Sequence, residues 1–358
     1  MLYYLNCLFH SDYIWGRLFN FDSTKPLASW IKSSLEPIKD IPRYLVPCYF
    51  DAVVSGVYNL LVHRVHEMMP EFIREGHDFP QLLALATLQF LTVCNSANLP
   101  QLSPALAAPK APKQCVTLSA GLPHFSTGYM RCWGRDTFIS LRGLMLLTGR
   151  FNEARYIILG FAQCMRHGLI PNLLDNGTKP RFNCRDAVWW WLHSIKQYVE
   201  EAPHGRNILN DKVSRIFPYD DSEANGPGQF DQVLIDVMQE ALQVHFQGLQ
   251  YRERNAGYEI DAHMTDNGFN NQIGVHPETG FVFGGNQWNC GTWMDKMGSS
   301  EKAGNRGRPI TSRDGSAVEL IGLELAVLRF MQSLSESGAI EYKSVKRKGP
   351  NGILNSYI

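Results

Sequence analysis

Residues 181–194 read RFNCRDAVWWWLHS and place a charged pair, Arg185 and Asp186, at the start of an apolar run. The run predicts a helix over 186–200, and Pro203 closes it because proline cannot continue a helix. The first two of the three tryptophans follow Asp186 by three and four residues and therefore share its face. Three consecutive tryptophans cannot all face one core. We expect at least one to line a cleft or a protein contact, with burial in the core as the alternative.

The same order of loop, polar joint and helix recurs along the chain. Apolar residues at three- and four-residue spacing predict further helices over 49–69, 79–93, 152–167, 230–248 and 316–334. In the third of these, Asn152 is a good N-cap and Gly168 a good terminator. Strand signals are sparse, as in GFVFGG at 280–285. The sequence thus predicts an all-α fold, with helices wound around a central cavity.

The composition narrows the classes of partner. Lys+Arg and Asp+Glu are equal at 34 each, so no net field attracts nucleic acid or anionic lipid, and we expect neither as a partner. The eight cysteines show no paired spacing, which favours reduced thiols and a cytoplasmic location. The sequence shows no CxxC motif, signal peptide or membrane-spanning run, and we expect no metal and no cofactor.

A second polar joint is YMRCWGRDTF, residues 129–138, with Trp133, Arg135 and Asp136 ahead of an apolar run. Asp136 in this place is as readily a helix cap as a binding residue. Charged donors and acceptors beside a tryptophan ring also suit a neutral polyol, since they meet hydroxyl groups while the ring covers an apolar sugar face. This joint is therefore a candidate sugar site.

The stretch WNCGTWMDKMG, residues 288–298, gathers two tryptophans around one carboxylate, Asp295. Dry aromatic walls favour the neutral form of a carboxyl group, which a general acid requires near neutral pH. Glycoside hydrolysis uses such an acid together with a second carboxylate. We therefore expect Asp295 to be held protonated beside Trp293.

The last polar joint is SRDGSAVELIGLEL, residues 312–325, where Glu319 shares a helix face with small residues and can reach a cavity. The alternative is a solvated helical glutamate. Just upstream, GNRGRPITSRDG carries Arg306, Arg308 and Arg313 but lacks the GxxxxGK[ST] arrangement, so it is a weak phosphate signal. Carboxylates, tryptophans and arginines at helix joints together indicate carbohydrate.

Four stretches carry a resemblance to a known family: residues 121–150, 181–195, 263–300 and 305–325. They closely resemble the C-terminal amylo-alpha-1,6-glucosidase region of eukaryotic glycogen debranching enzymes, and the likeness extends from about residue 20 to residue 349. The resemblance implies a glucoamylase-like (α/α)6 toroid and an inverting hydrolysis that releases the α-1,6-linked glucose at a glycogen branch. The implied partner is glycogen or a branched limit dextrin.

The resemblance also implies roles for individual residues. Asp295 in TWMDK corresponds to the general acid. The other positions that correspond to the substrate pocket are Trp133, Arg135, Asp136, Arg185, Asp186, Trp293 and Glu319.

Two features differ from the family pattern. The family's upstream 4-alpha-glucanotransferase module is not present, and no GLPE stretch, which carries the family's general base, occurs in the sequence. We therefore expect a toroid that is incomplete at its C-terminus and a chain with weak or no hydrolysis. The expected division is N-terminal glucosidase helices, a Pro/Ala-rich linker or loop, the main glucosidase part and a divergent tail, over 1–97, 98–120, 121–349 and 350–358.

Two other interpretations remain open. The chain is alternatively a catalytically inactive fragment that binds glycogen or pairs with an intact subunit. A different helical toroid enzyme, such as a zinc prenyltransferase-like protein, is disfavoured by the lack of metal-ligand spacing.

Overall fold

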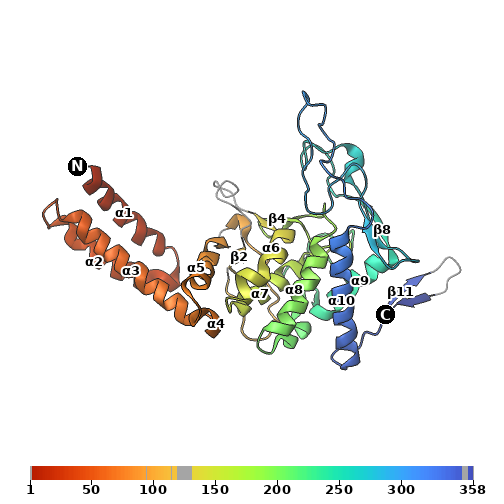
Figure 1. The fold of residues 1–358 in the computed structure, drawn as a ribbon, viewed down its shortest axis with the longest axis horizontal. Coiled ribbons are helices and arrows are strands. Elements are labelled where there is room, and N and C mark those ends of the chain that lie inside the picture. Colours follow the sequence, from red (N-terminus) through yellow and green to blue (C-terminus); the bar gives the residue numbers. More distant parts are fainter. Residues whose placement is uncertain (1, 94, 114, 119–130, 349–353, 358) are drawn as a thin grey trace. The chain divides into compact units, whose positions relative to one another are not determined.

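The computed structural model describes residues 2–93, 95–113, 115–118, 131–348 and 354–357 (Figure 1). The chain forms two compact units, Met1–Leu85 and Ala86–Ile358. The described residues are mostly helical, as the sequence predicted, with short strands between the helices. No helix among these residues is both long and apolar enough to span a membrane.

The smaller unit consists of helices and short turns. Its helices are α1 (Leu2–Leu18), α2 (Lys25–Leu35), α3 (Val46–Met68), α4 (Glu71–Arg74) and α5 (Asp78–Ala86). Helices α2 and α3 pack against α1. Their shared core includes Cys7, Ile31, Leu35, Ile38 and Val46. The predicted helix over 49–69 is confirmed as α3, whereas the one over 79–93 ends at Ala86 and continues as a short 3-10 turn.

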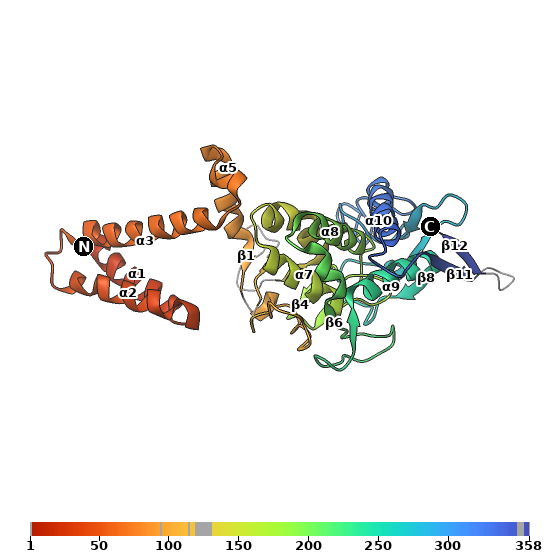
Figure 2. The ribbon, with the colours of Figure 1, turned by 90° about the horizontal axis from the view of Figure 1, so that it is seen from below.

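Among the described residues, the larger unit is built on five α-helices, of which α8 is the centre. They are α6 (Gly134–Leu141), α7 (Phe151–Gln163), α8 (Ala187–Glu201), α9 (Leu234–Gln247) and α10 (Val318–Glu336). Helix α8 packs against α6, α7 and α10, and Figures 1 and 2 both show it beside them. Trp189 and Trp191 are fully buried in this core, and Trp190 is partly buried against it. Burial in the core is therefore the role of at least two of the three tryptophans.

Short antiparallel strands fix the loops around these helices. Three of them form one sheet, β3 (Cys132–Trp133), β4 (Leu173–Asp175) and β5 (Lys179–Arg181). A second three-stranded sheet has β8 (Leu249–Arg252), β9 (Asn270–Val275) and β10 (Val282–Gly284). Two-stranded pairs are β1 (Leu91–Thr92) with β2 (Thr117–Leu118), β6 (Lys212–Ser214) with β7 (Asp231–Val233), and β11 (Val345–Lys348) with β12 (Leu354–Tyr357).

Helix ends differ from the sequence prediction at several joints. Asn152 is not an N-cap, because α7 begins at Phe151 after Arg150 and ends at Gln163, before Gly168. The strand predicted in GFVFGG is confirmed as β10, but β8 and β9 beside it were not predicted. These strands matter for function, because they hold the loops on which the polar joints lie.

Candidate active site

Two acids of the predicted site share one buried arginine. Arg135, in the first turn of α6, donates from Nε to Asp186 Oδ2 at 2.6 Å and from Nη1 to Asp295 Oδ2 at 2.7 Å. Asp186 lies immediately before α8 and is fully buried. We call these three residues the Asp295 centre. Segments up to 160 residues apart in the sequence therefore meet at one guanidinium.

Backbone geometry positions this arginine. Gly134 donates its N–H to the carbonyl of Asn172 at 2.7 Å, which holds the start of α6 against the loop before β4. A Cβ at position 134 would overlap the carbonyl oxygen of Pro171. Only glycine permits this approach, so the WGRD sequence sets the position of Arg135 through its glycine as well as its charges.

The charges of the Asp295 centre stabilise one another. Burial opposes the charge on Arg135, but Asp186 and Asp295 outweigh it and raise the pKa of the guanidinium. Burial also opposes the charge on Asp295, yet Arg135 and Lys296 lower the pKa of that carboxyl below its usual value. Lys296 Nζ lies 3.3 Å from Asp295 Oδ1. Two cations beside Asp295 therefore favour the carboxylate, against the expectation that Asp295 is held protonated.

The tryptophans around Asp295 do not form a dry wall. Trp288 is 40% exposed and Trp293 is 52% exposed, so both rings keep much of their surface in water. The residue between Trp293 and Asp295, Met294, adopts a left-handed backbone with φ 64°. A methionine in this conformation is strained, which is typical of segments that orient functional side chains.

Arg185 is enclosed by glycines beside this centre. Its N–H donates to the carbonyl of Gly291 at 2.7 Å, and its Nη2 donates to the carbonyl of Arg313 at 2.6 Å. A Cβ on Gly284 would lie 3.0 Å from its Cδ, and a Cβ on Gly285 would lie 3.4 Å from its Nε. Burial lowers the pKa of Arg185 to about 10. Its Nε and Nη1 are buried without a hydrogen-bond partner among the described residues, and a ligand oxygen would satisfy them.

Arg313 contacts two residues of the predicted site, Glu319 and Trp293, although the sequence did not predict Arg313 itself as a site residue. Its Nη2 lies 2.5 Å from Glu319 Oε2, at the start of α10, and its guanidinium carbon lies 5.4 Å from the centre of the Trp293 ring. Its backbone is left-handed, with φ 49°. The glutamate is therefore held by an ion pair and is not a freely solvated helical residue. The Gly-rich stretch GNRGRPITSRDG, which contains Arg313, is the sequence signal that could have indicated this role, but by itself it indicates only a weak phosphate site.

Trp133 and Asp136 lie at the same helix start as Arg135. Trp133 is the N-cap residue of α6, so Asp136 is not the cap but an exposed acid in the first turn. Desolvation of its carboxyl by the surrounding protein raises the pKa of Asp136, and the nearby Asp295 and Asp186 add to this against the effect of Arg135. Asp136, whose pKa is raised, and Asp295, whose pKa is lowered, thus both lie near the Arg135 guanidinium. Neighbouring carboxyl groups with pKa values shifted in opposite directions are common at sites of acid and base chemistry.

Similarity to known proteins identifies the family of the chain. Residues 85–354 match the family model described as amylo-alpha-1,6-glucosidase. The chain belongs to the amylo-alpha-1,6-glucosidase family. Over 322 residues it is 43% identical to the glycogen debranching enzyme of Saccharomyces cerevisiae (strain ATCC 204508 / S288c), a match that covers 89% of this chain. The chain spans about a fifth of the length of that relative, 20%.

The amylo-alpha-1,6-glucosidase family is one of glycoside hydrolases, which confirms the class of chemistry predicted from the sequence. The family match includes the Asp295 centre, Arg313 and Glu319. Among the described residues no cluster of three or more His, Cys, Asp or Glu side chains is arranged to hold a metal ion. The guanidinium donors and carboxylate acceptors of this arrangement are groups that bind hydroxyl groups.

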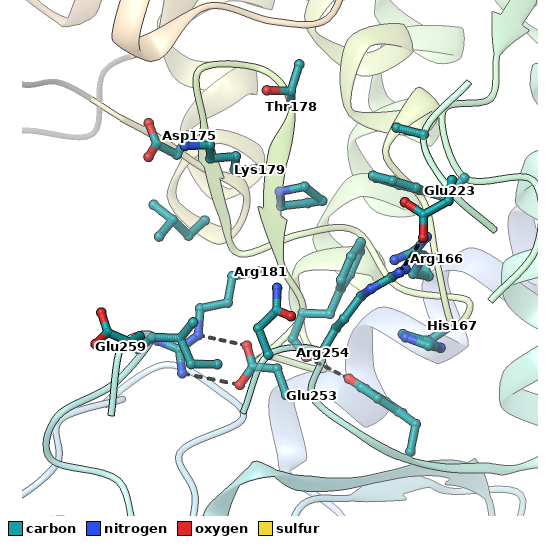
Figure 3. Close-up of a pocket in the computed structure, with 18 of the residues that line it drawn as sticks. Arg166, His167, Asp175, Thr178, Lys179, Arg181, Glu223, Glu253, Arg254 and Glu259 are labelled. Carbon is teal, nitrogen blue, oxygen red and sulfur yellow. Dashed lines mark hydrogen bonds and ion pairs between the residues drawn. The ribbon is translucent and has the colours of Figure 1, made fainter. Parts of the chain in front are cut away.

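A pocket of about 800 Å³ lies elsewhere in this amylo-alpha-1,6-glucosidase unit (Figure 3). Its walls come from Arg131, the loop after α7, the β4–β5 hairpin, the β6–β7 loop and the segment from Tyr251 to Ile260. None of the eight predicted site residues is among those that line it. We call it the hairpin pocket.

Proposed function

We propose that this chain is the glucosidase region of a glycogen debranching enzyme, whose reaction is the hydrolysis, with inversion, of the α-1,6-linked glucose at glycogen branch points. Asp295 is the general acid in this proposal, and glycogen or a branched limit dextrin is the substrate. The observation that carries it is the contact of Arg135 with both Asp186 and Asp295 at 2.6 and 2.7 Å, within a chain of the amylo-alpha-1,6-glucosidase family.

The (α/α)6 toroid belongs to the same proposal. Helices α6, α8 and α10 each begin at a polar joint, which carries Arg135, Asp186 or Glu319. A toroid in which alternate helices start at one end places such joints around a common opening. The mostly helical content and the packing of α8 against α6 and α10 support this arrangement.

Substrate binding has to change the protonation of Asp295 before the carboxyl group can donate a proton. In the free protein Arg135 and Lys296 lower its pKa. A glucose unit that excludes water from the loop increases the cost of a charged carboxylate, and its hydroxyl groups compete for the donors of Arg135. Both effects raise the pKa towards the range that proton donation to the departing glycosidic oxygen requires.

Inverting hydrolysis also requires a base carboxylate about 6.5–9.5 Å from the acid. Among the described residues, Asp186 is fully buried and bonded to Arg135, and Glu319 is bonded to Arg313. Neither of these carboxylates is free to activate water. We therefore propose that hydrolysis by this chain alone is weak or absent, and that its sugar site is retained.

Glucose release from a branched limit dextrin by the 358-residue chain tests the assignment. Asp295→Asn should reduce any measured rate by about 10²–10⁴-fold, the usual contribution of general acid catalysis. Asp40→Asn, at an exposed residue of the smaller unit, is the matched control. An Asp295→Asn variant as fast as the parent chain would exclude Asp295 as the acid.

The second candidate function is glycogen binding without catalysis. It is favoured because Asp186 is bonded to Arg135 and Glu319 is bonded to Arg313. Glycogen affinity that survives Asp295→Asn, together with no glucose release by the parent chain, would support it. Rapid turnover by the parent chain would rule it out.

A further inference from the structure

We propose that the hairpin pocket binds an unbranched α-1,4-linked glucan segment beside the Asp295 centre. The proposal rests on the proposed function, because it assigns the pocket to the main chain that carries the branch. It concerns residues outside the predicted site, which the pocket does not include.

Two paired strands, β3 and β4, connect the segment of Arg135 with the pocket. Trp133, in β3, pairs with Leu173, in β4, and Leu173 lines the pocket. Arg135 follows Trp133 by two residues. The pocket wall and the segment that carries the shared arginine are therefore neighbours in one sheet, and we place one extended glucan across both.

The lining is rich in charge but balanced, which indicates a neutral ligand. Five cationic side chains line it, from Arg131, Arg166, Lys179, Arg181 and Arg254. Four carboxylates accompany them, from Asp175, Glu223, Glu253 and Glu259. The excess is a single cation, which favours a polyol, bound by donors and acceptors in similar number, over a phosphate, which is held by several cations without carboxylate partners.

Ion pairs within the lining fix the positions of these groups. Arg181 Nε lies 2.7 Å from Glu253 Oε1, and Arg254 Nη2 lies 2.8 Å from Glu223 Oε1, as the dashed lines in Figure 3 mark. Arg181 Nη1 also donates to the carbonyl of Ile260 at 3.0 Å. Paired in this way, the charges cancel locally and leave a polar surface of fixed shape.

Aromatic rings complete the wall. The His167 ring stacks on Tyr251 with centres 4.2 Å apart, and the Tyr251 hydroxyl donates to the carbonyl of Phe182 at 2.6 Å. The guanidinium of Arg166 lies 4.0 Å from the centre of the Phe217 ring. The Nε of Arg166 is buried without a hydrogen-bond partner among the described residues. Apolar rings with a few placed polar groups are the usual lining of a small-molecule site, and such a preformed wall lowers the ordering cost of binding.

Filling the pocket tests this assignment directly. Ala224 is exposed and lines the pocket, so Ala224→Trp should block it without disturbing the core. The matched control is Ala339→Trp, at an exposed alanine beyond α10 and outside the lining. Titration of the chain with maltoheptaose should show a loss of affinity of about tenfold or more for Ala224→Trp, equivalent to about 1.4 kcal/mol, and none for Ala339→Trp.

A second pair of variants tests the polar wall. Arg254→Ala removes a lining side chain, whereas Arg252→Ala removes an exposed arginine two residues away that pairs with Asp266 outside the lining. Maltoheptaose affinity should fall about three- to tenfold for Arg254→Ala, as expected for a lost charged hydrogen bond, and stay unchanged for Arg252→Ala. Inorganic phosphate should not compete.

The outcomes separate this inference from the proposed function. Maltoheptaose binding that is lost in Ala224→Trp but kept in Asp295→Asn supports the pocket, even if no variant releases glucose. Equal maltoheptaose affinity in Ala224→Trp and the parent chain overturns the inference, even if the parent chain is active. Failure of the parent chain to bind maltoheptaose, or competition by phosphate, also overturns it.

Discussion

The Asp295 centre and the hairpin pocket use arginine–carboxylate pairs in opposite ways. In the centre one buried guanidinium, that of Arg135, serves two acids at once. In the pocket Arg181 pairs with Glu253 and lies 3.5 Å from Asp261, which is outside the lining, while Arg254 pairs with Glu223 in water. A shared buried cation makes the charge state of several groups depend on one residue. Single changes should therefore have large effects in the centre and small ones in the pocket.

Removal of the shared arginine should give the largest effect. Arg135→Ala leaves the fully buried Asp186 without its cation, and breaking a buried pair in this way costs about 3–5 kcal/mol. Arg254→Ala, at the solvated pair of the pocket, should cost less than about 1 kcal/mol. Urea unfolding of both variants measures the difference. Similar free energies of unfolding for the two variants would contradict the contrast between the regions.

The backbone approach that positions Arg135 should give the next largest effect. Gly134→Ala forces a Cβ into the carbonyl of Pro171, and relief of such overpacking costs about 1–3 kcal/mol. Gly322→Ala is the control, because its Cβ meets nothing within 4 Å and it lies inside α10. That change should stabilise the protein by about 0.5–1 kcal/mol.

Thermal unfolding, followed by circular dichroism, compares these two glycine variants. Opposite shifts of the melting temperature are expected. A Gly134→Ala variant with unchanged stability would show that the segment before α6 can move away, and that Arg135 is not fixed by its glycine.

The arrangement around Trp293 should respond to its arginine more weakly. Arg313→Met removes the guanidinium that holds Glu319 and faces the Trp293 ring, and a partly exposed contact of this kind contributes about 0.5–2 kcal/mol. Affinity for a branched limit dextrin should fall about three- to tenfold, with maltoheptaose affinity unchanged. Arg306→Met, at an exposed arginine paired with Glu301, is the control. Equal losses of affinity for the branched limit dextrin and for maltoheptaose would mean that Arg313 affects the Asp295 centre and the hairpin pocket alike.

The helices were predictable because their apolar spacing is local. Helices α3, α8, α9 and α10 follow the predicted ranges within a few residues. The polar joints were also predictable, since Arg135, Asp186 and Asp295 each stand beside a helix start or a glycine-bearing loop. Their direct contact connects segments that are 51 and 160 residues apart, so the spacing of apolar residues contains no information about it.

The charge state of Asp295 and the hairpin pocket were beyond sequence reasoning for a different reason. The aromatic residues of WNCGTWMDKMG suggested a dry acid, but exposure depends on how the loop folds, and Trp293 is half exposed. The pKa depends on cations from elsewhere in the chain, above all Arg135. The pocket likewise collects residues from five separate stretches of the chain, none of which carries a recognisable motif.

The smallest effect should come from Lys296, which is the solvated neighbour of Asp295. The folded-state pKa of Asp295 lies below its value in the unfolded chain, so the ionised carboxyl contributes stability above about pH 4. That contribution is lost as the pH falls through the folded-state pKa. Lys296 Nζ is one of the two cations responsible, but its side chain is 81% exposed, so screening keeps its share under about 1 kcal/mol.

Lys296→Met should therefore raise the pKa of Asp295 towards its unfolded value and reduce the loss of stability on acidification. Carbon-detected NMR titration of the Asp295 carboxyl measures the shift, with Lys302→Met, at an exposed lysine of the same region, as the control. Because Arg135 remains in place, the carboxyl should still titrate below its usual value. If the pKa of Asp295 returned fully to its usual value in Lys296→Met, the solvated lysine, and not the buried Arg135, would be the residue that lowers it.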